Sequence, residues 1–221
     1  LIIGSNFINS GIINNCLCGT SSHNMSSEKQ FRNPTEYGAP KPETATFTAT
    51  GGASAVISNK KSNIKIESAT IGRIVDYNQK DALNMGAVMA CAAADTLKRH
   101  LDDLNRKEDY YDLILTGDLG LYGREILKEF MMKEHKINIS CNYNDCGVML
   151  YDLEEQKEVL AGGSGPVCSA LVLYGFILNE MKKKNIKKVL LIATGALFSP
   201  TMLYQKENIL SIAHAISLEA I

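Results

Sequence analysis

Apolar residues follow helical spacing in several segments of the chain. The clearest helix is predicted over residues 81–104, where they recur at intervals of three or four: Leu83, Ala87, Ala90, Ala94, Leu97 and Leu101. The first half of this helix is almost all Gly, Ala and Met, so another backbone can approach it closely. Helices are also predicted at residues 120–133 and 167–184, and residues 1–12 have the pattern of a helix end closed by Gly11.

Apolar runs predict buried strands at residues 14–20, 111–116, 186–194 and 209–218. Further strands are expected at residues 64–77, at 147–151, and at 44–58 with a bulge at Gly51 and Gly52. Because apolar strands alternate with helices, the pattern predicts an α/β protein whose sheet is covered on both faces.

Composition is that of an ordinary globular protein: 221 residues, 45% apolar and 21% charged. The formal net charge of −1 gives no overall field that would favour a nucleic-acid partner, and none is expected. No apolar window approaches the roughly 18 residues of a membrane span, and no signal peptide opens the chain. Leu1 lies inside an apolar helical pattern that lacks an N-cap, so we expect the natural start to be missing.

Six cysteines are too dilute for a disulfide framework in a chain of this length, so they are interpreted as reduced thiols. Cys16 and Cys18 lie two apart in a strand-like run, where alternate residues share a face and pack together. Cys141 and Cys146 are a second close pair. Structural zinc sites usually repeat their cysteine pairs, so neither a metal nor a cofactor is predicted.

A glycine-rich loop before a predicted helix is the first candidate for binding chemistry. Gly162, Gly163, Ser164 and Gly165 precede Pro166, which suits the first helical position, with Ser164 or Gly165 as N-cap. Backbone N–H groups at a helix N-terminus form an anion site. The alternative is a plain turn that needs glycine for its geometry. The loop lacks the Gly-Lys-Ser/Thr ending of a nucleotide P-loop.

Asp118 is the second candidate, because it follows a predicted buried strand at the edge where ligands gather in α/β sheets. A helix N-cap is the simpler interpretation of this residue. The third candidate is the polar loop after residue 20. In this loop Arg32 could form a bidentate ion pair with a carboxylate, and His23 follows a strand end. His100 and His135 are expected to be solvated, and His214 to be a core residue with a hydrogen-bond partner.

Several short segments together resemble one known family. They are residues 20–23 (TSSH), 28–38 (EKQFRNPTEYG), 84–90 (NMGAVMA), 92–96 (AAADT), 144–147 (NDCG), 161–165 (AGGSG) with 168–170 (CSA), and 193–200 (ATGALFSP). This set resembles the stage V sporulation protein AD family across essentially the whole chain. The resemblance implies a thiolase-like fold layered α-β-α-β-α, with residues 1–59 as the remainder of the N-terminal half and residues 60–221 as the C-terminal half.

The resemblance also implies a function in spore formation. Members are the soluble component of a channel complex that moves dipicolinic acid, with calcium, into the forespore and releases it in germination. The implied location is peripheral, at the cytoplasmic face of the forespore (spore inner) membrane. Implied partners are dipicolinate, the other stage V A subunits and a second copy in a homodimer. From position and charge, the expected ligand-binding residues are His23, Arg32, Asp118, Gly162, Gly163, Ser164 and Gly165.

Departures from related enzymes argue against catalysis. The segment that corresponds to the thiolase nucleophilic cysteine is expected before Leu1. Gly117 and Asp118 stand where related condensing enzymes have a histidine, and their asparagine is replaced within residues 162–165. Covalent acyl transfer needs an activated thiolate and an oxyanion stabiliser. The remaining alternatives are an acyltransferase or condensing enzyme, and a purely structural adaptor of the channel complex.

Overall fold

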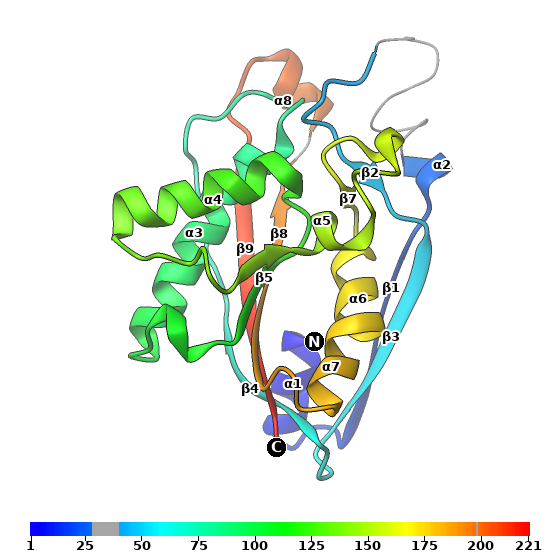
Figure 1. Ribbon diagram of the computed structural model, residues 1–221, viewed down its shortest axis with the longest axis vertical. Coiled ribbons are helices and arrows are strands. Elements are labelled where there is room, and N and C mark those ends of the chain that lie inside the picture. Colours follow the sequence, from blue (N-terminus) through cyan, green and yellow to red (C-terminus); the bar gives the residue numbers. More distant parts are fainter. Residues whose placement is uncertain (28–39, 198) are drawn as a thin grey trace.

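The computed structural model describes residues 1–27, 40–197 and 199–221. Its centre is a five-stranded sheet in the order β4-β9-β8-β5-β6 (Figure 1). These strands are β4 (Ile64–Thr70), β9 (Ser211–Ala220), β8 (Lys188–Ala196), β5 (Leu113–Thr116) and β6 (Tyr143–Asp145). β5 pairs in parallel with both β6 and β8, whereas β9 is antiparallel to β8 and β4.

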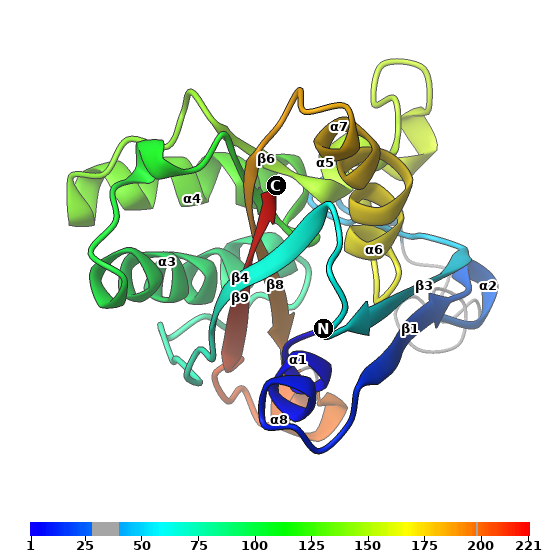
Figure 2. The same cartoon turned by 90° about the horizontal axis from the view of Figure 1, so that it is seen from below.

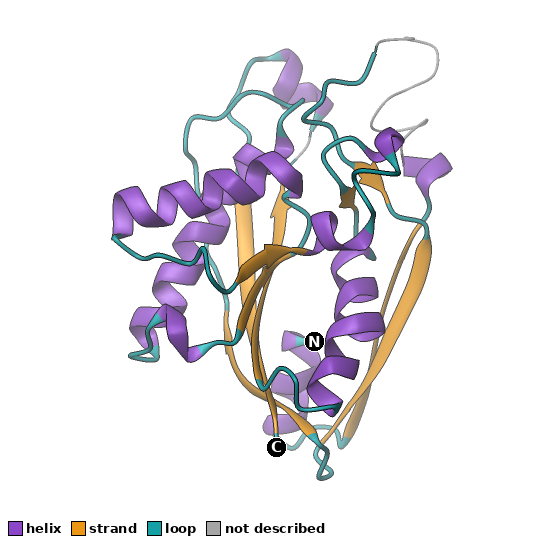
Figure 3. Ribbon diagram, in the orientation of Figure 1, coloured by secondary structure: helices purple, strands orange, loops and turns teal. Residues whose placement is uncertain are grey.

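The central strands are apolar on both faces, as their continuous apolar runs predict. Ile114, Leu190 and Ile192 point into one cluster of buried side chains, while their neighbours Leu115 and Leu191 point into the other. Because successive strand residues face opposite ways, this arrangement requires helices on both sides of the sheet. Figure 3 shows helices on both sides.

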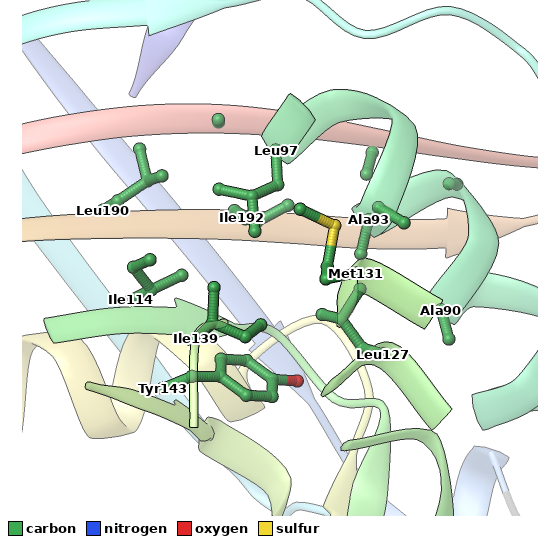
Figure 4. Packing of buried hydrophobic residues seen from close by; sticks show 14 of the residues in the cluster. Ala90, Ala93, Leu97, Ile114, Leu127, Met131, Ile139, Tyr143, Leu190 and Ile192 are labelled. Atoms are coloured by element: carbon green, nitrogen blue, oxygen red, sulfur yellow. The ribbon is translucent and has the colours of Figure 1, made fainter. Parts of the chain in front are cut away.

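Two long helices cover the first face: α3 (Met85–Asp103) and α4 (Gly120–His135). Leu97 of α3 and Leu127 and Met131 of α4 pack there against the sheet (Figure 4). The two helices meet at Gly86 and Gly123, where a Cβ added at Gly86 would lie 2.3 Å from the carbonyl oxygen of Leu119. The close backbone approach predicted from the small residues of α3 is therefore confirmed.

The second face is covered by one helical run, α6 (Cys168–Val172), a π-helical turn (Leu173–Ile177) and α7 (Leu178–Lys182). α1 (Ile2–Asn9) packs against the same face of the sheet, and the antiparallel pair of β1 (Asn15–Ser22) and β3 (Gly51–Ser58) lies beyond these helices. The order in space is therefore helices, sheet, helices and strand pair. These are four successive layers of the expected α-β-α-β-α arrangement.

Short elements complete the described chain: α2 (Asn24–Ser27), β2 (Phe47–Thr48), α5 (Cys146–Leu150), β7 (Gly163–Ser164) and α8 (Pro200–Tyr204), with 3-10 turns at Glu108–Tyr110 and Lys157–Val159. β2 pairs in parallel with β7. In the described ranges, no helix is long and apolar enough to cross a bilayer.

Five sequence predictions are wrong in detail. Residues 146–150 form helix α5 instead of a strand, because the Asp145 carboxylate caps its N-terminus. The strand predicted at 64–77 ends at Thr70, and the one at 44–58 is divided between β2 and β3. β1 is not buried, because one face of the β1–β3 pair is exposed and alternate residues of β1, such as Leu17 (72% exposed), lie on that face. His100, expected in solvent, is fully buried.

Candidate ligand-binding site

A cavity of about 480 Å³ opens at the carboxyl ends of β5 and β8. This is the edge at which α/β sheets bind ligands. Its wall includes Gly117 and Asp118 after β5 and Thr194 in β8, together with hydroxyl groups from the segment around β2 and the methionines Met85 and Met89 of α3. Among the described residues of this wall, Asp118 is the one with a charged side chain.

Asp118 is half-buried and joins the two sides of the cavity. Its Oδ2 accepts a hydrogen bond from the Gly165 N–H at 3.0 Å, and its Oδ1 accepts one from the Thr194 hydroxyl at 3.2 Å. The carboxylate therefore holds the glycine-rich loop against the end of β8. The N-cap interpretation of Asp118 is wrong, because α4 begins after Leu119 and takes its cap from another strand.

That cap is Asp145, at the end of β6, which sequence reasoning missed as a site residue. Its buried carboxylate accepts hydrogen bonds from the N–H groups of Leu119 (2.9 Å), Gly120 (3.0 Å) and Gly147 (2.9 Å) and from the Thr116 hydroxyl (2.6 Å). Burial raises the pKa of Asp145 to about 6, although these hydrogen bonds favour the charged form. Asp145 thus fixes the start of α4, and with it the backbone beside Asp118.

Backbone groups of the glycine-rich loop are engaged in hydrogen bonds that its sequence does not predict. β7 pairs with β2 up to Ser164, and the Gly165 N–H is engaged by Asp118. The helix begins only at Cys168, with Val167 as N-cap, so the predicted N-cap at Ser164 or Gly165 and the predicted place of Pro166 are wrong. Gly165 has a φ of +95°, where L side chains are strained, so the turn itself requires glycine.

The predicted ligand-binding residues are only partly brought together. Asp118, Ser164 and Gly165 line the cavity. Gly162 and Gly163 are absent from its described lining, and His23 is exposed. Arg32 lies outside the described residues. The lining residues that the prediction omitted, above all Thr194 and the hydroxyls around β2, come from strands far apart in sequence.

A second cavity, of about 580 Å³, shares Pro166, Ser169 and Ala193 with the first. Its wall is mostly apolar, from Leu1, Leu173 and similar residues, with His214 at one side. The Nδ1 of His214 accepts a hydrogen bond from the Gly72 N–H at 3.1 Å, in line with the predicted partnered core histidine. Although this cavity is larger, the first one gathers the charged and hydroxyl groups that orient a polar ligand.

Two buried thiols near these cavities are poorly suited to nucleophilic attack. Cys146 and Cys168 are fully buried, and burial raises the pKa of both thiols well above the ordinary value. A raised pKa reduces the thiolate that would react. Cys16 and Cys18 have their sulfurs 3.8 Å apart on one face of β1, next to Gly4, so the shared face is confirmed. Within the described residues, no cluster of three or more metal-binding side chains occurs.

The arrangement of sheet and helices is similar to that of solved condensing enzymes. The 3-oxoacyl-[acyl-carrier-protein] synthase III of Aquifex aeolicus VF5 superposes with a TM-score of 0.57 at 12% identity, over 99% of this chain and 61% of that one. The corresponding Pseudomonas aeruginosa PAO1 enzyme gives 0.55 at 7% identity, over 99% and 64%. These likenesses show the fold alone, which is thiolase-like.

Sequence comparison identifies the group within that class. The family model described as "Stage V sporulation protein AD" matches residues 1–219. Stage V sporulation protein AD of Bacillus subtilis (strain 168) is 46% identical over 217 residues, which are 98% of this chain and 63% of that protein. The chain therefore belongs to the stage V sporulation protein AD family. It spans less than two thirds of the length of this relative.

Proposed function

We propose that this chain binds dipicolinate together with calcium in the cavity at the ends of β5 and β8. In this proposal it is the peripheral subunit of a channel complex at the forespore membrane, where it supports dipicolinate uptake in sporulation and release in germination. The observation that carries the proposal is a cavity of about 480 Å³ with one carboxylate among neutral hydroxyls. Its volume lies within the range of small-molecule sites.

The charge of the wall favours a ligand that brings its own cation. Dipicolinate is a dianion at neutral pH, and in this cavity its two carboxylates would lie close to the Asp118 carboxylate. Calcium cancels the charge of the ligand. It also prefers carboxylate, hydroxyl and carbonyl oxygens, which Asp118 and its neighbours supply. Asp118 would then attract the complex, while it repels free dipicolinate.

Family membership gives independent support. The Bacillus subtilis relative is named for stage V of sporulation. The replacement of the catalytic histidine position by Gly117 and Asp118, together with buried thiols of raised pKa, agrees with a binding function on an enzyme-like fold.

Calorimetry tests the proposal directly. Dipicolinate is titrated into the chain with and without calcium, and calcium alone serves as a further control. We expect saturable binding that calcium strengthens. An absence of binding heat in both titrations would contradict the proposal and favour the adaptor alternative.

Two substitutions locate the site. Asp118→Asn should weaken binding of the calcium complex and reduce the difference between the titrations with and without calcium. Ser164→Asp puts a bulkier side chain at a buried position of the wall and should abolish binding. Asp102→Asn, at an exposed position of α3, is the matched control and should bind as the parent chain does. Unchanged dipicolinate affinity in Ser164→Asp would exclude this cavity.

An acyl-CoA titration with a thioester assay separates the remaining alternative. The condensing-enzyme fold of the neighbours motivates this control. Thioester turnover would favour a transferase or condensing enzyme over the binding function.

A further inference from the structure

A concentration of lysines lies at the end of the molecule opposite the cavity. Seven of the 23 basic side chains fall in two short segments, the turn at residues 59–63 and the connection at residues 182–188. Neither segment contains an acidic residue. We call the surface that these two segments form with Lys65 the lysine-rich end.

The fold brings the two segments together through β9. Ile64 pairs with Ala220, and the Ile221 N–H donates to the carbonyl oxygen of Asn63 at 2.9 Å. On the other side of β9, the Ala220 N–H donates to the carbonyl oxygen of Lys187 at 2.8 Å. Figure 2, which views the molecule from below, shows the β3–β4 turn and the α7–β8 connection on either side of the chain end at β9.

Most of these lysines project into solvent. Lys60, Lys61, Lys182, Lys184 and Lys187 are exposed, and none of them forms an ion pair with another described residue. Lys65 pairs with Glu219 at 2.7 Å and Lys183 with Glu180 at 2.9 Å, while the Lys188 ammonium lies over the Tyr110 ring.

The carboxylates in contact with the lysine-rich end are too few to neutralise it. They are Glu180, Glu219 and Asp112, which accepts hydrogen bonds from the N–H groups of Lys187 and Lys188. Eight lysines against three carboxylates leave this end strongly positive in a chain whose net charge is −1. The positive charge is therefore local, and it is offset elsewhere in the molecule.

We propose that the lysine-rich end docks on a bilayer surface that contains anionic lipids. Lysine is a hydrated point charge that suits a diffuse anionic surface, whereas sites that read individual phosphates rely on the bidentate geometry of arginine. Both segments contain lysine and no arginine. They also lack the aromatic side chains on which single-stranded nucleic acid stacks. The proposal does not depend on the identity of the cavity ligand.

Docking in this way orients the cavity. β8 begins at Lys188 in the lysine-rich end and finishes at Ala196 in the cavity wall. A nine-residue strand rises roughly 26 Å along its length. The cavity would then face away from the lipid surface, about one sheet length above it.

Vesicle flotation tests the proposal. The chain is mixed with vesicles of phosphatidylcholine alone, or of phosphatidylcholine with phosphatidylglycerol, at low and high salt. We expect binding only to the anionic vesicles, and loss of that binding at high salt, because the attraction is screened beyond a Debye length. Equal binding to both vesicle types, or binding to neither, would overturn the proposal.

A matched pair of triple variants locates the surface. Lys182→Gln, Lys184→Gln and Lys187→Gln together should weaken partition about a hundredfold, since each lysine near an anionic surface contributes roughly fivefold. The control combines Lys80→Gln, Lys157→Gln and Lys206→Gln, which remove the same charge from exposed positions elsewhere. An equal loss in the control would show a net-charge effect and overturn the proposal. Both triple variants should bind dipicolinate in calorimetry as the parent chain does. The vesicle result and the dipicolinate result can therefore be judged independently.

Discussion

The two edges of the central sheet hold their buried ionisable groups in different ways. At the β6 edge, beside the cavity, Asp145 is held mainly by backbone N–H groups. Toward the β4 edge, side chains hold one another: the His100 ring bonds to the Thr70 hydroxyl at 2.7 Å and to the Tyr111 hydroxyl at 2.6 Å. Tyr111 also accepts from Arg106 at 2.7 Å, and Arg106 forms a forked pair with Glu67.

The two arrangements have different structural roles: one positions the chain around the cavity, and the other holds strands together. Because Asp145 bonds to the backbone where α4 and α5 begin, it sets where the chain runs around the cavity. The Glu67 network joins β4 to the segment before β5 and, through the Ser217 hydroxyl at 2.8 Å, to β9. It fastens strands and the end of α3 to one another. We therefore expect changes near Asp145 to affect both stability and ligand binding, and changes in the network to affect stability alone.

The largest effect is expected for Asp145→Ala. It leaves three backbone N–H groups without their acceptor in a buried place, while the Thr116 hydroxyl keeps the Tyr143 hydroxyl as a partner. Unsatisfied buried donors cost about 1–3 kcal/mol each before relaxation, so we expect a loss of about 4 kcal/mol in the free energy of unfolding. Urea denaturation measures it. The neighbouring Asp118→Asn, which is half-buried, should cost below about 1 kcal/mol. Similar losses in both would contradict a special position for Asp145.

The pH dependence of stability should differ in sign between Asp145 and His100. Burial raises the pKa of Asp145 from 3.8 to about 6, so its native form binds more protons than the unfolded chain, and its contribution falls as pH rises through this window. Burial lowers the pKa of His100 from 6.5 to about 4, so its contribution is lost as pH falls through that window.

Each shift corresponds to about 3 kcal/mol, and the two largely cancel in the parent chain. His100→Gln should therefore become less stable as pH rises from about 4 to about 6.5, while Asp145→Asn should become more stable over the same interval. Urea midpoints at the two pH values distinguish these slopes. Parallel slopes in the two variants would refute the assignment.

Arg106→Leu should cost about 2 kcal/mol, because it leaves the mostly buried Glu67 without its cation. The side chains of Arg106 and Glu67 are 15% and 16% exposed. Lys133 forms an ion pair with Glu129 in which both side chains are exposed, 68% and 63%. Lys133→Leu is thus the control, and a loss below about 1 kcal/mol is expected. Equal losses in the two unfolding curves would mean that burial does not distinguish them.

Local pattern was enough to predict the layers, the long helices and the place of Asp118. It failed where the outcome depends on a strand pairing between distant segments. Asp145 acts as a cap only because β6 lies beside β5, and the short apolar run after it looks like a strand in isolation. His100 follows Leu97 by three residues, which places it on the apolar side of α3, but the charges around it suggested solvent.

The smallest effects come from a matched pair of threonines, Thr70 at the β4 edge and Thr194 beside the cavity. Thr70→Val removes the hydroxyl that His100 bonds to in a buried place, which should cost about 1.5 kcal/mol. Thr194→Val removes the hydroxyl that donates a hydrogen bond to Asp118. Thr194 is half-buried at the cavity wall, however, where water can replace the donor. We expect a loss below about 0.5 kcal/mol there. Calorimetry should show the reverse order for dipicolinate with calcium: Thr194→Val weakens binding, and Thr70→Val leaves it unchanged. If both substitutions affected stability and binding alike, the division between residues that position the cavity and residues that hold the strands together would not hold.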